Sequence, residues 1–141
     1  VDPVIHMMAH QRGVQVKGGT MRLGSYPCEL VAGSLAGKAY ATETVRERHR
    51  HRYEFNRDYE QALSSKGLRV SGRSPDGKFI ETIELLEHPW FVAVQFHPEF
   101  QSKPLRPHPL FAAFVKAVYE HSSTREASIA APRKALDEPR I

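Results

Sequence analysis

The chain has 141 residues, of which 40% are hydrophobic and 26% charged, and its formal net charge is +4. This is the composition of a soluble globular protein, and no apolar run approaches the ~20 residues that a membrane helix needs. Neither a membrane span nor a signal peptide is therefore expected. A single cysteine excludes an intrachain disulfide and fits a reducing cytosol.

The basic balance does not point to nucleic acid, because the positive residues are spread along the chain and no nucleic-acid-binding motif is present. No metal site is expected either. His6 and His10 could share a helix face at i and i+4, but no cysteine or carboxylate accompanies them. The Gly-Gly-Thr-Met-Arg segment lacks the ending of a P-loop, so this chain is not expected to bind nucleotide by itself.

The first half of the chain favours short elements. Residues 20–24 and 26–31 are predicted to be strands around a turn, and the glycine-containing stretches 32–34 and 36–38 are interpreted as breaks. Residues 42–48 fit a short helix and 51–55 a strand. Asn56 is a suitable N-cap for a helix over 57–66, which Gly67 would close.

In the second half, strands at 68–73 and 79–86 flank a Ser-Pro-Asp-Gly turn, which predicts a hairpin. The apolar strand at 91–96 is typical of a strand covered on both faces in an α/β sheet. Apolar residues at helical spacing from Leu110 to Val118 predict a core helix that ends near 119–121. From 122 to 141 the pattern stops, and the composition indicates a disordered tail.

A histidine and a glutamate lie two residues apart at the end of the apolar strand. In a strand, His97 and Glu99 would point to one face, and Pro98 between them stops the strand. Histidine moves protons near neutral pH, and a carboxylate at its other ring nitrogen holds the tautomer. The pair is a candidate base with its orienting carboxylate, although most His-x-Glu pairs only begin a solvated loop.

This segment, Phe-Val-Ala-Val-Gln-Phe-His-Pro-Glu-Phe at 91–100, resembles the C-terminal part of the class I glutamine amidotransferases. Three further segments narrow the resemblance to the CTP synthase family: Gly-Gly-Thr-Met-Arg-Leu-Gly at 18–24, Glu-Arg-His-Arg-His-Arg-Tyr-Glu at 47–54 and Gly-Leu-Arg-Val-Ser-Gly-Arg-Ser at 67–74. The resemblance implies an α/β fold, namely the C-terminal portion of a flavodoxin-like three-layer domain with a mixed sheet and flanking helices.

The resemblance also implies an activity. His97 and Glu99 would be two members of a Cys-His-Glu triad, in which a cysteine thiolate attacks the glutamine amide and a glutamyl thioester forms. His97 would protonate the leaving ammonia and then activate water, while Glu99 orients His97. The ammonia would serve the ATP-dependent amination of UTP to CTP in a separate synthase domain, a ligase reaction of pyrimidine biosynthesis.

The basic run at 47–54 is by default a solvated charged face. Strand alternation would place Arg50 and Arg52 opposite His49 and His51, so only part of the run can face one site. In the family, the last arginine of the run and the following tyrosine border the glutamine pocket. The resemblance thus implies glutamine-binding roles for Arg52 and Tyr53, and an arginine fork suits an α-carboxylate.

The chain departs from the family because it has no Gly-x-Cys-x-Gly elbow. Cys28 lies in a strand-like stretch without flanking glycines and is expected to be a small buried residue, not the nucleophile. The chain opens without an initiator methionine, and its length is short for a whole amidotransferase domain. We therefore expect residues 1–121 to be the C-terminal part of that domain, inactive without the N-terminal half and its oxyanion-hole donors.

Two hypotheses stay open at this point: part of a glutamine-hydrolysing enzyme, or a non-catalytic, truncated amidotransferase-like module or interaction partner. Under the first, the partners are glutamine, the N-terminal half of the domain, the synthase domain and further copies of the enzyme, which is a tetramer in the family. ATP and Mg would belong to the synthase domain, with no cofactor in this chain. The location would be cytoplasmic, with no nucleic-acid or membrane partner.

Overall fold

The computed structural model describes residues 2–9, 12–13 and 21–130. Its strands are β1 (Ile5–Met7), β2 (Arg22–Leu30), β3 (Thr44–His51), β4 (Tyr53–Phe55), β5 (Leu68–Arg73), β6 (Ile80–Leu85) and β7 (Val92–Val94). Its helices are α1 (Leu35–Tyr40), α2 (Glu60–Ser64) and α3 (Pro109–Ala130), with 3₁₀ turns η2 (Arg57–Tyr59) and η3 (Pro98–Gln101).

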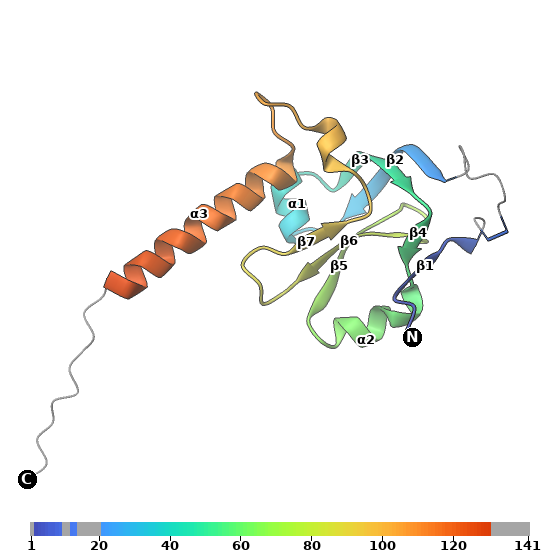
Figure 1. The fold of residues 1–141 in the computed structure, drawn as a ribbon, viewed down its shortest axis with the longest axis horizontal. Coiled ribbons are helices and arrows are strands. Elements are labelled where there is room, and N and C mark those ends of the chain that lie inside the picture. The colour runs from blue at the N-terminus through green and yellow to red at the C-terminus, as the bar shows by residue number, and fades with distance from the viewer. Residues whose placement is uncertain (1, 10–11, 14–20, 131–141) are drawn as a thin grey trace, which may run out of the picture.

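The strands form a five-stranded sheet in the order β3-β2-β5-β6-β7 and a separate two-stranded ribbon of β1 and β4 (Figure 1). The expected α/β organisation is confirmed. Each pairing among the described strands is antiparallel, and β7 lies at the edge of the larger sheet. All three residues of β7 are only partly buried. The prediction that this strand is covered on both faces is therefore wrong for the described chain.

The predicted hairpin at 68–86 is confirmed as β5 and β6. Its turn is fixed by polar contacts within the Ser-Pro-Asp-Gly segment. The Ser74 hydroxyl donates to Asp76 at 2.6 Å and accepts from the backbone N–H of Phe79 at 2.9 Å. Gly77 adopts a φ of 67°, in the left-handed region that glycine enters without a Cβ clash.

Two predictions about the first half were wrong. The two strands expected at 20–24 and 26–31 are one strand, β2, which continues through Gly24 at a φ of 119°. The helix expected at 42–48 is the start of β3, which pairs with β2 along almost its whole length. The burial of β3 alternates, with Val45, Glu47 and His49 facing inward. Sequence patterns did not reveal this strand because most of its inward side chains are polar.

The stretch expected to be a break at 36–38 forms the short helix α1. Ser34 caps its N-terminus by accepting from the backbone N–H of Gly37 at 2.9 Å. The carboxylate of Glu84, from β6, accepts from the N–H groups of Leu35 and Ala36 at 3.0 and 2.8 Å. A tertiary contact thus satisfies helix donors that the local sequence leaves open.

The helical segment predicted at 57–66 is confirmed as η2 followed by α2. Asn56 caps it as expected, since its side-chain oxygen accepts from the N–H of Asp58 at 3.2 Å. Gly67 follows at a φ of 90°, which suits the predicted end of the helix. The strand predicted at 51–55 is shorter, because a bend at Arg52 separates β3 from β4.

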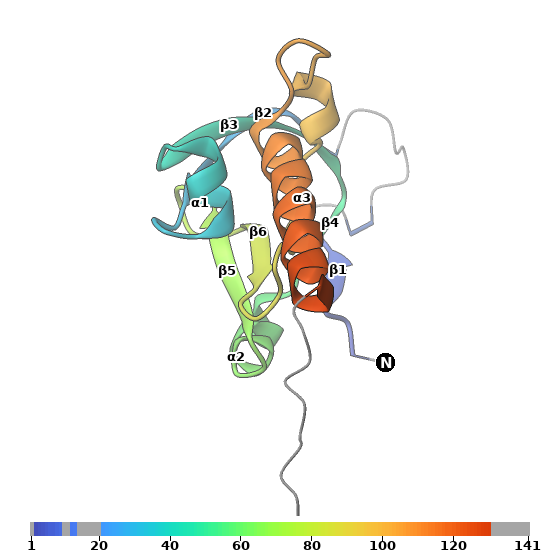
Figure 2. The same cartoon turned by 90° about the vertical axis from the view of Figure 1, so that its left-hand side faces the viewer.

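The hydrophobic core lies between the sheet and the two helices α1 and α3. Its six buried members come from five segments of the chain: Cys28, Leu30, Ala36, Val45, Phe96 and Leu110. Helix α3 starts at this core and then extends beyond the sheet, as two perpendicular views show (Figures 1 and 2). It runs to Ala130, so residues 122–130 are helical and do not belong to the expected disordered tail.

Several predictions fall on residues outside the described ranges. These are His10, the Gly-Gly-Thr part of the 18–24 segment, and the tail from 131 onward.

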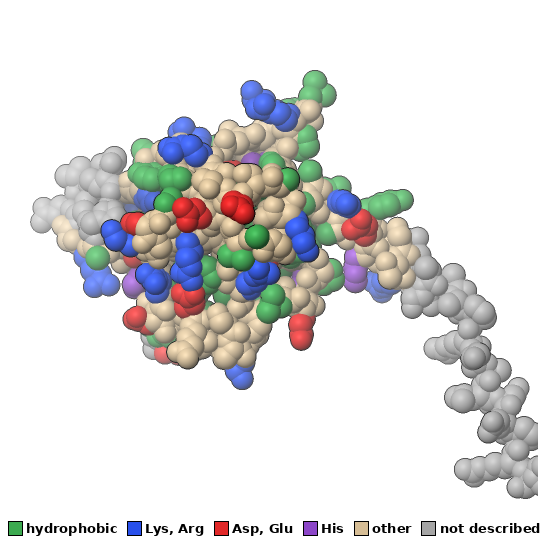
Figure 3. Space-filling view, turned by 180° about the vertical axis from the view of Figure 1, so that it is seen from behind, with side chains coloured by type: hydrophobic (Ala, Val, Ile, Leu, Met, Phe, Trp, Pro, Cys, Tyr) green, Lys and Arg blue, Asp and Glu red, His purple; other side chains and the backbone are tan. Residues whose placement is uncertain are grey.

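None of the described helices is both long enough and apolar enough to span a membrane. Seen from behind, the molecule carries Lys and Arg side chains interspersed with Asp and Glu (Figure 3).

Candidate functional site

His97 and Glu99 are in direct contact. The Nδ1 atom of His97 lies 2.6 Å from Oε1 of Glu99, and both side chains are open to solvent, at 37% and 55% exposure. This hydrogen bond lowers the pKa of the Glu99 carboxyl. A carboxylate at Nδ1 leaves Nε2 of His97 available to exchange protons with a substrate.

The 3₁₀ turn η3 brings this pair together. Pro98 occupies the first position of η3, where a fixed φ and a missing N–H are tolerated, and His97 is its N-cap residue. The backbone N–H of His97 donates to the carbonyl of Arg48 at 2.8 Å, which ties the turn to β3. The His97 ring stacks on Phe100, with centroids 5.1 Å apart. The expected pairing is thus present, through a turn instead of a continuing strand.

The far end of η3 is held by Glu47, a buried carboxylate on the inward face of β3. Gln101 donates to Glu47 Oε2 at 2.6 Å and to the Arg46 carbonyl at 3.0 Å. Tyr40 and His108 contact the other carboxylate oxygen at 2.7 and 2.9 Å. Glu47 therefore joins β3 to α1, to η3 and to the start of α3.

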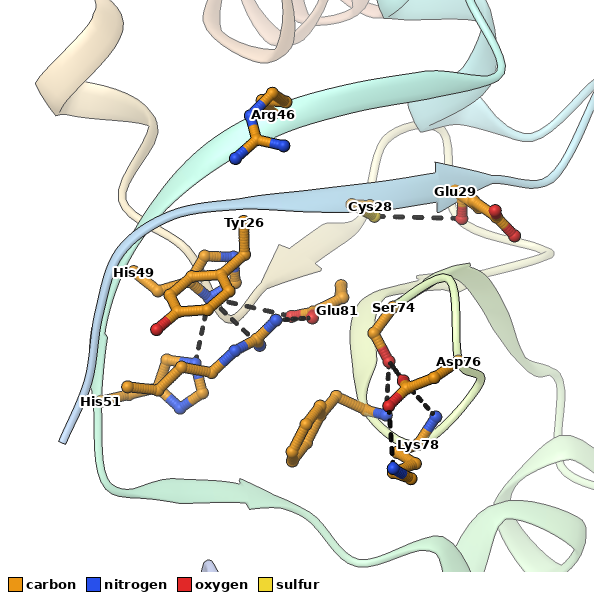
Figure 4. Close-up of polar contacts among 12 residues, drawn as sticks. Tyr26, Cys28, Glu29, Arg46, His49, His51, Ser74, Asp76, Lys78 and Glu81 are labelled. Atoms are coloured by element: carbon orange, nitrogen blue, oxygen red, sulfur yellow. Dashed lines mark hydrogen bonds and ion pairs between the residues drawn. The ribbon is translucent and has the colours of Figure 1, made fainter.

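A second polar cluster lies further along the same face. It contains His49, His51 and Glu81, which Figure 4 labels, together with Arg22. Arg22 Nη2 is 2.6 Å from Glu81 Oε1, with both side chains almost completely buried. His49 Nδ1 lies 3.0 Å from His51 Nε2 and 3.4 Å from Arg22 Nη1. The guanidinium of Arg22 also stacks over the ring of Tyr26, 4.5 Å from its centroid.

Burial determines the charge state of this cluster. It lowers the pKa of His49 to about 3, with the charge of Arg22 as the next cause. Burial likewise lowers the pKa of His51, and raises that of the Glu81 carboxyl against the opposing effect of Arg22. The charge of His97 contributes to the lowered pKa of both histidines, which places the cluster within electrostatic reach of the candidate base.

Arg52 and Tyr53 lie at and just after the bend between β3 and β4. The Tyr53 side chain is 51% exposed, and Arg52 is partly buried. Both backbone carbonyls are held: that of Arg52 accepts from the N–H of Met8 at 3.0 Å, and that of Tyr53 contacts His51 Nδ1 at 2.8 Å. The bend is thus anchored on two sides.

Cys28 lies in the core, completely buried. Burial raises its thiol pKa to about 12, with Glu81 adding to the effect. A thiol with such a pKa has almost no thiolate at neutral pH and is a poor nucleophile. The predicted buried, structural role of Cys28 agrees with this environment.

His49, His51 and Glu81 also place three potential ligand atoms within 4.8 Å of one another. Arg22 already neutralises the Glu81 carboxylate at 2.6 Å, where a cation would otherwise be needed. The cluster is charge-balanced by protein groups and does not call for a metal ion. His6, considered earlier with His10, lies in β1 and contacts Glu54 at 3.3 Å.

The comparisons with known proteins decide the family. The model of the family "Glutamine amidotransferase class-I" matches residues 3–117. This chain belongs to the class I glutamine amidotransferases. Its sequence is 60% identical over 116 residues to the CTP synthase of Geotalea uraniireducens, covering 82% of this chain and 22% of that protein. It is 55% identical over 133 residues to the CTP synthase of Thermomicrobium roseum, covering 92% of this chain and 24% of that protein.

The fold agrees with this assignment. The glutaminase domain of Trypanosoma brucei CTPS, solved with bound acivicin, superimposes with a TM-score of 0.74 at 34% identity, covering 83% of this chain and 46% of that chain. The expected amidotransferase fold is confirmed. This amidotransferase sequence spans about a quarter or less of the length of the curated relatives it matches, in their C-terminal region.

Sequence reasoning missed Arg22 and Glu81 as members of a site. They are far apart in the chain, and no local pattern joins them. The one available signal was a charged residue inside a predicted strand, because Glu81 follows Ile80 directly in a strand that sequence alone predicts. Glu47 carries the same signal, hidden within a run of exposed basic residues.

Proposed function

We propose that this chain is the C-terminal part of the glutaminase domain of a CTP synthase, and that it contributes His97 and Glu99 to glutamine hydrolysis. The observation that carries the proposal is the 2.6 Å contact between His97 Nδ1 and Glu99 Oε1, at a solvent-open turn. The similarity to CTP synthases and the match to the amidotransferase family support the choice of glutamine as substrate and of hydrolysis as the reaction.

In this reaction a cysteine from the N-terminal half of the domain attacks the side-chain amide of glutamine. His97 donates a proton to the departing ammonia and then removes one from the water that hydrolyses the thioester. His97 first takes its proton from the cysteine thiol, so it is an imidazolium before ammonia leaves and again after it deprotonates water. Glu99 holds the tautomer with the proton on Nδ1 and stabilises the imidazolium at both of these points. In this proposal His97 and Glu99 therefore act with a cysteine other than Cys28, which is buried.

Arg52 and Tyr53 bind the amino-acid end of glutamine in this proposal. A guanidinium pairs bidentately with an α-carboxylate, and the exposed Tyr53 side chain is open to a ligand. The bend that carries them follows directly on β3, to which the His97 turn is hydrogen-bonded. A short path in the fold therefore links substrate binding to the proton-transfer pair.

The N-terminal half of the domain would cover surfaces that the described residues leave open. The β7 edge is unpaired on one side, and Phe111, Phe114 and Val118 of α3 are exposed at 41%, 49% and 52%. Such apolar surface is rarely left to water in a monomer. We also propose that the complete enzyme has a synthase domain that uses ATP and Mg, that it forms homo-oligomers, and that it is cytoplasmic. A non-catalytic module with the same partner surface is the competing function.

The test compares two nitrogen sources in the complete synthase. We expect His97→Ala to lower kcat with glutamine by at least ~10²-fold, the usual scale for a positioned acid–base group, and to leave CTP formation from free ammonia unchanged. His121→Ala on α3 is the matched control, since that histidine is exposed and remote from η3 in sequence. Equal losses with both nitrogen sources would assign His97 to the fold and favour the non-catalytic alternative.

A further inference from the structure

A chain of hydrogen bonds runs from the buried cluster to the backbone of the Arg52–Tyr53 bend. His51 is its central member: Nε2 lies 3.0 Å from His49 Nδ1, and Nδ1 lies 2.8 Å from the carbonyl oxygen of Tyr53. The side chain of His51 thus connects the buried cluster to the peptide bond that follows Tyr53.

The direction of the bond between His51 and the bend follows from its acceptor. A carbonyl oxygen only accepts, so Nδ1 of His51 carries the proton and donates to Tyr53. Both histidines are kept uncharged by their surroundings, so Nε2 of His51 has a lone pair. Nδ1 of His49 lies between this atom and Arg22 Nη1, at 3.0 and 3.4 Å.

The His49 end of this series of hydrogen bonds is rigid. The His49 side chain is completely buried and meets the rings of Tyr26 and Phe96 edge-on, at centroid distances of 5.6 and 5.8 Å. Phe96 directly precedes His97. The ion pair of Arg22 and Glu81 fills the remaining polar side of the cluster, with Glu81 Oε2 3.8 Å from His49 Nδ1. His49 therefore has one orientation available, and it fixes His51 in turn.

We propose that His51 is a positioning residue for glutamine: by donating to the Tyr53 carbonyl it sets the bend that presents Arg52 and Tyr53 to the substrate. This inference rests on the proposed function, because it assumes that Arg52 and Tyr53 bind glutamine. His51 does not touch substrate. It acts on affinity through the backbone, whereas His97 and Glu99 act on the chemical step.

Two amides of different length test the geometry in the complete synthase. In His51→Asn the amide NH₂ takes the place of Nδ1 and can still donate to the carbonyl. In His51→Gln the amide reaches the place of Nε2 instead, and His51→Leu has no donor. We expect the Gln and Leu variants to raise KM for glutamine roughly 5- to 10-fold, as for a lost side chain–backbone hydrogen bond. The Asn variant should stay within about 3-fold of wild type.

In all three variants, kcat with glutamine and the rate with free ammonia should stay near wild-type values, because the triad and the synthase domain are intact. Coupling to Arg52 gives a second readout. Arg52→Lys alone should raise KM, and adding His51→Leu to it should raise KM by less than the two separate factors multiplied together, since both act on one contact.

The outcomes separate this inference from the proposed function. If Arg52→Lys raises KM while His51→Leu does not, or if the Asn and Gln variants behave alike, the positioning role of His51 is wrong and the glutamine site stands. If Arg52→Lys leaves KM unchanged, the assumed glutamine site is wrong and the inference falls with it. The His97→Ala comparison still decides the catalytic proposal in that case.

Discussion

At the scale of single residues, His49 is a histidine that folding keeps uncharged. Its pKa is lowered to about 3 by burial and by Arg22, whereas an unfolded chain has a histidine pKa near ~6.5. Between these two values the unfolded state binds more protons than the folded state. Stability is therefore highest above the unfolded value and falls as the pH drops through this window. His51 adds to the loss in the same direction.

We predict that the free energy of unfolding decreases between pH 6.5 and 4.5, with a contribution from His49 of up to about 1.4 kcal/mol per pH unit. His49→Gln, although less stable overall, should show a shallower dependence. Denaturant titrations across this range measure the slope, and His121→Gln serves as the control with an exposed histidine. A slope that stays the same in His49→Gln would mean that His49 is not the group that resists protonation.

Single residues also show what sequence alone can and cannot tell about the site. The His97–Glu99 pair is predictable because both members lie in one short segment. The contact nevertheless arises from a 3₁₀ turn, which strand periodicity does not describe. The cluster around His49 was not predictable, since Arg22 and Glu81 come from β2 and β6 and meet only after the sheet forms.

At the scale of elements, Glu47 holds η3 and helices α1 and α3 against β3. The two carboxylate oxygens of Glu47 accept hydrogen bonds from Gln101, Tyr40 and His108. In a glutamine at this position, the amide NH₂ would replace one oxygen and could not accept from the donor that faces it. We predict that Glu47→Gln lowers the free energy of unfolding by about 1–3 kcal/mol and also lowers kcat with glutamine, because η3 carries Glu99.

Thermal or denaturant unfolding of the Glu47→Gln variant, combined with glutamine and ammonia rates, checks this prediction. Glu29→Gln on the neighbouring strand β2 is the matched control, because the Glu29 side chain points to solvent. Wild-type stability and activity in Glu47→Gln would contradict the view that this carboxylate joins the four elements.

The elements that sequence missed share a physical cause. Helix α1 has only six residues, includes a glycine, and owes part of its N-terminal capping to Glu84 from a distant strand. Strand β3 buries Glu47 and His49, so hydrophobic periodicity does not mark its inward face. By contrast, the β5–β6 hairpin and the helix after Asn56 have local turn and cap residues that specify them, and both were predicted correctly.

At the scale of the whole molecule, the one thiol of the sequence lies in the hydrophobic core. We predict that the isolated chain releases no ammonia from glutamine above the rate without protein, since its one cysteine is buried and protonated. Cys28→Ser should behave identically. Ammonia release by the isolated chain that disappears in Cys28→Ser would show that the structure conceals a functional nucleophile.

The burial of Cys28 has a use in measuring how the molecule opens. Its side chain is completely buried, packed in the core that joins β2 to α1 and α3, and it is the one cysteine of the sequence. A thiol-alkylating reagent reaches it only when the sheet separates from these helices. The alkylation rate of Cys28 would thus report the frequency of that opening without any added label.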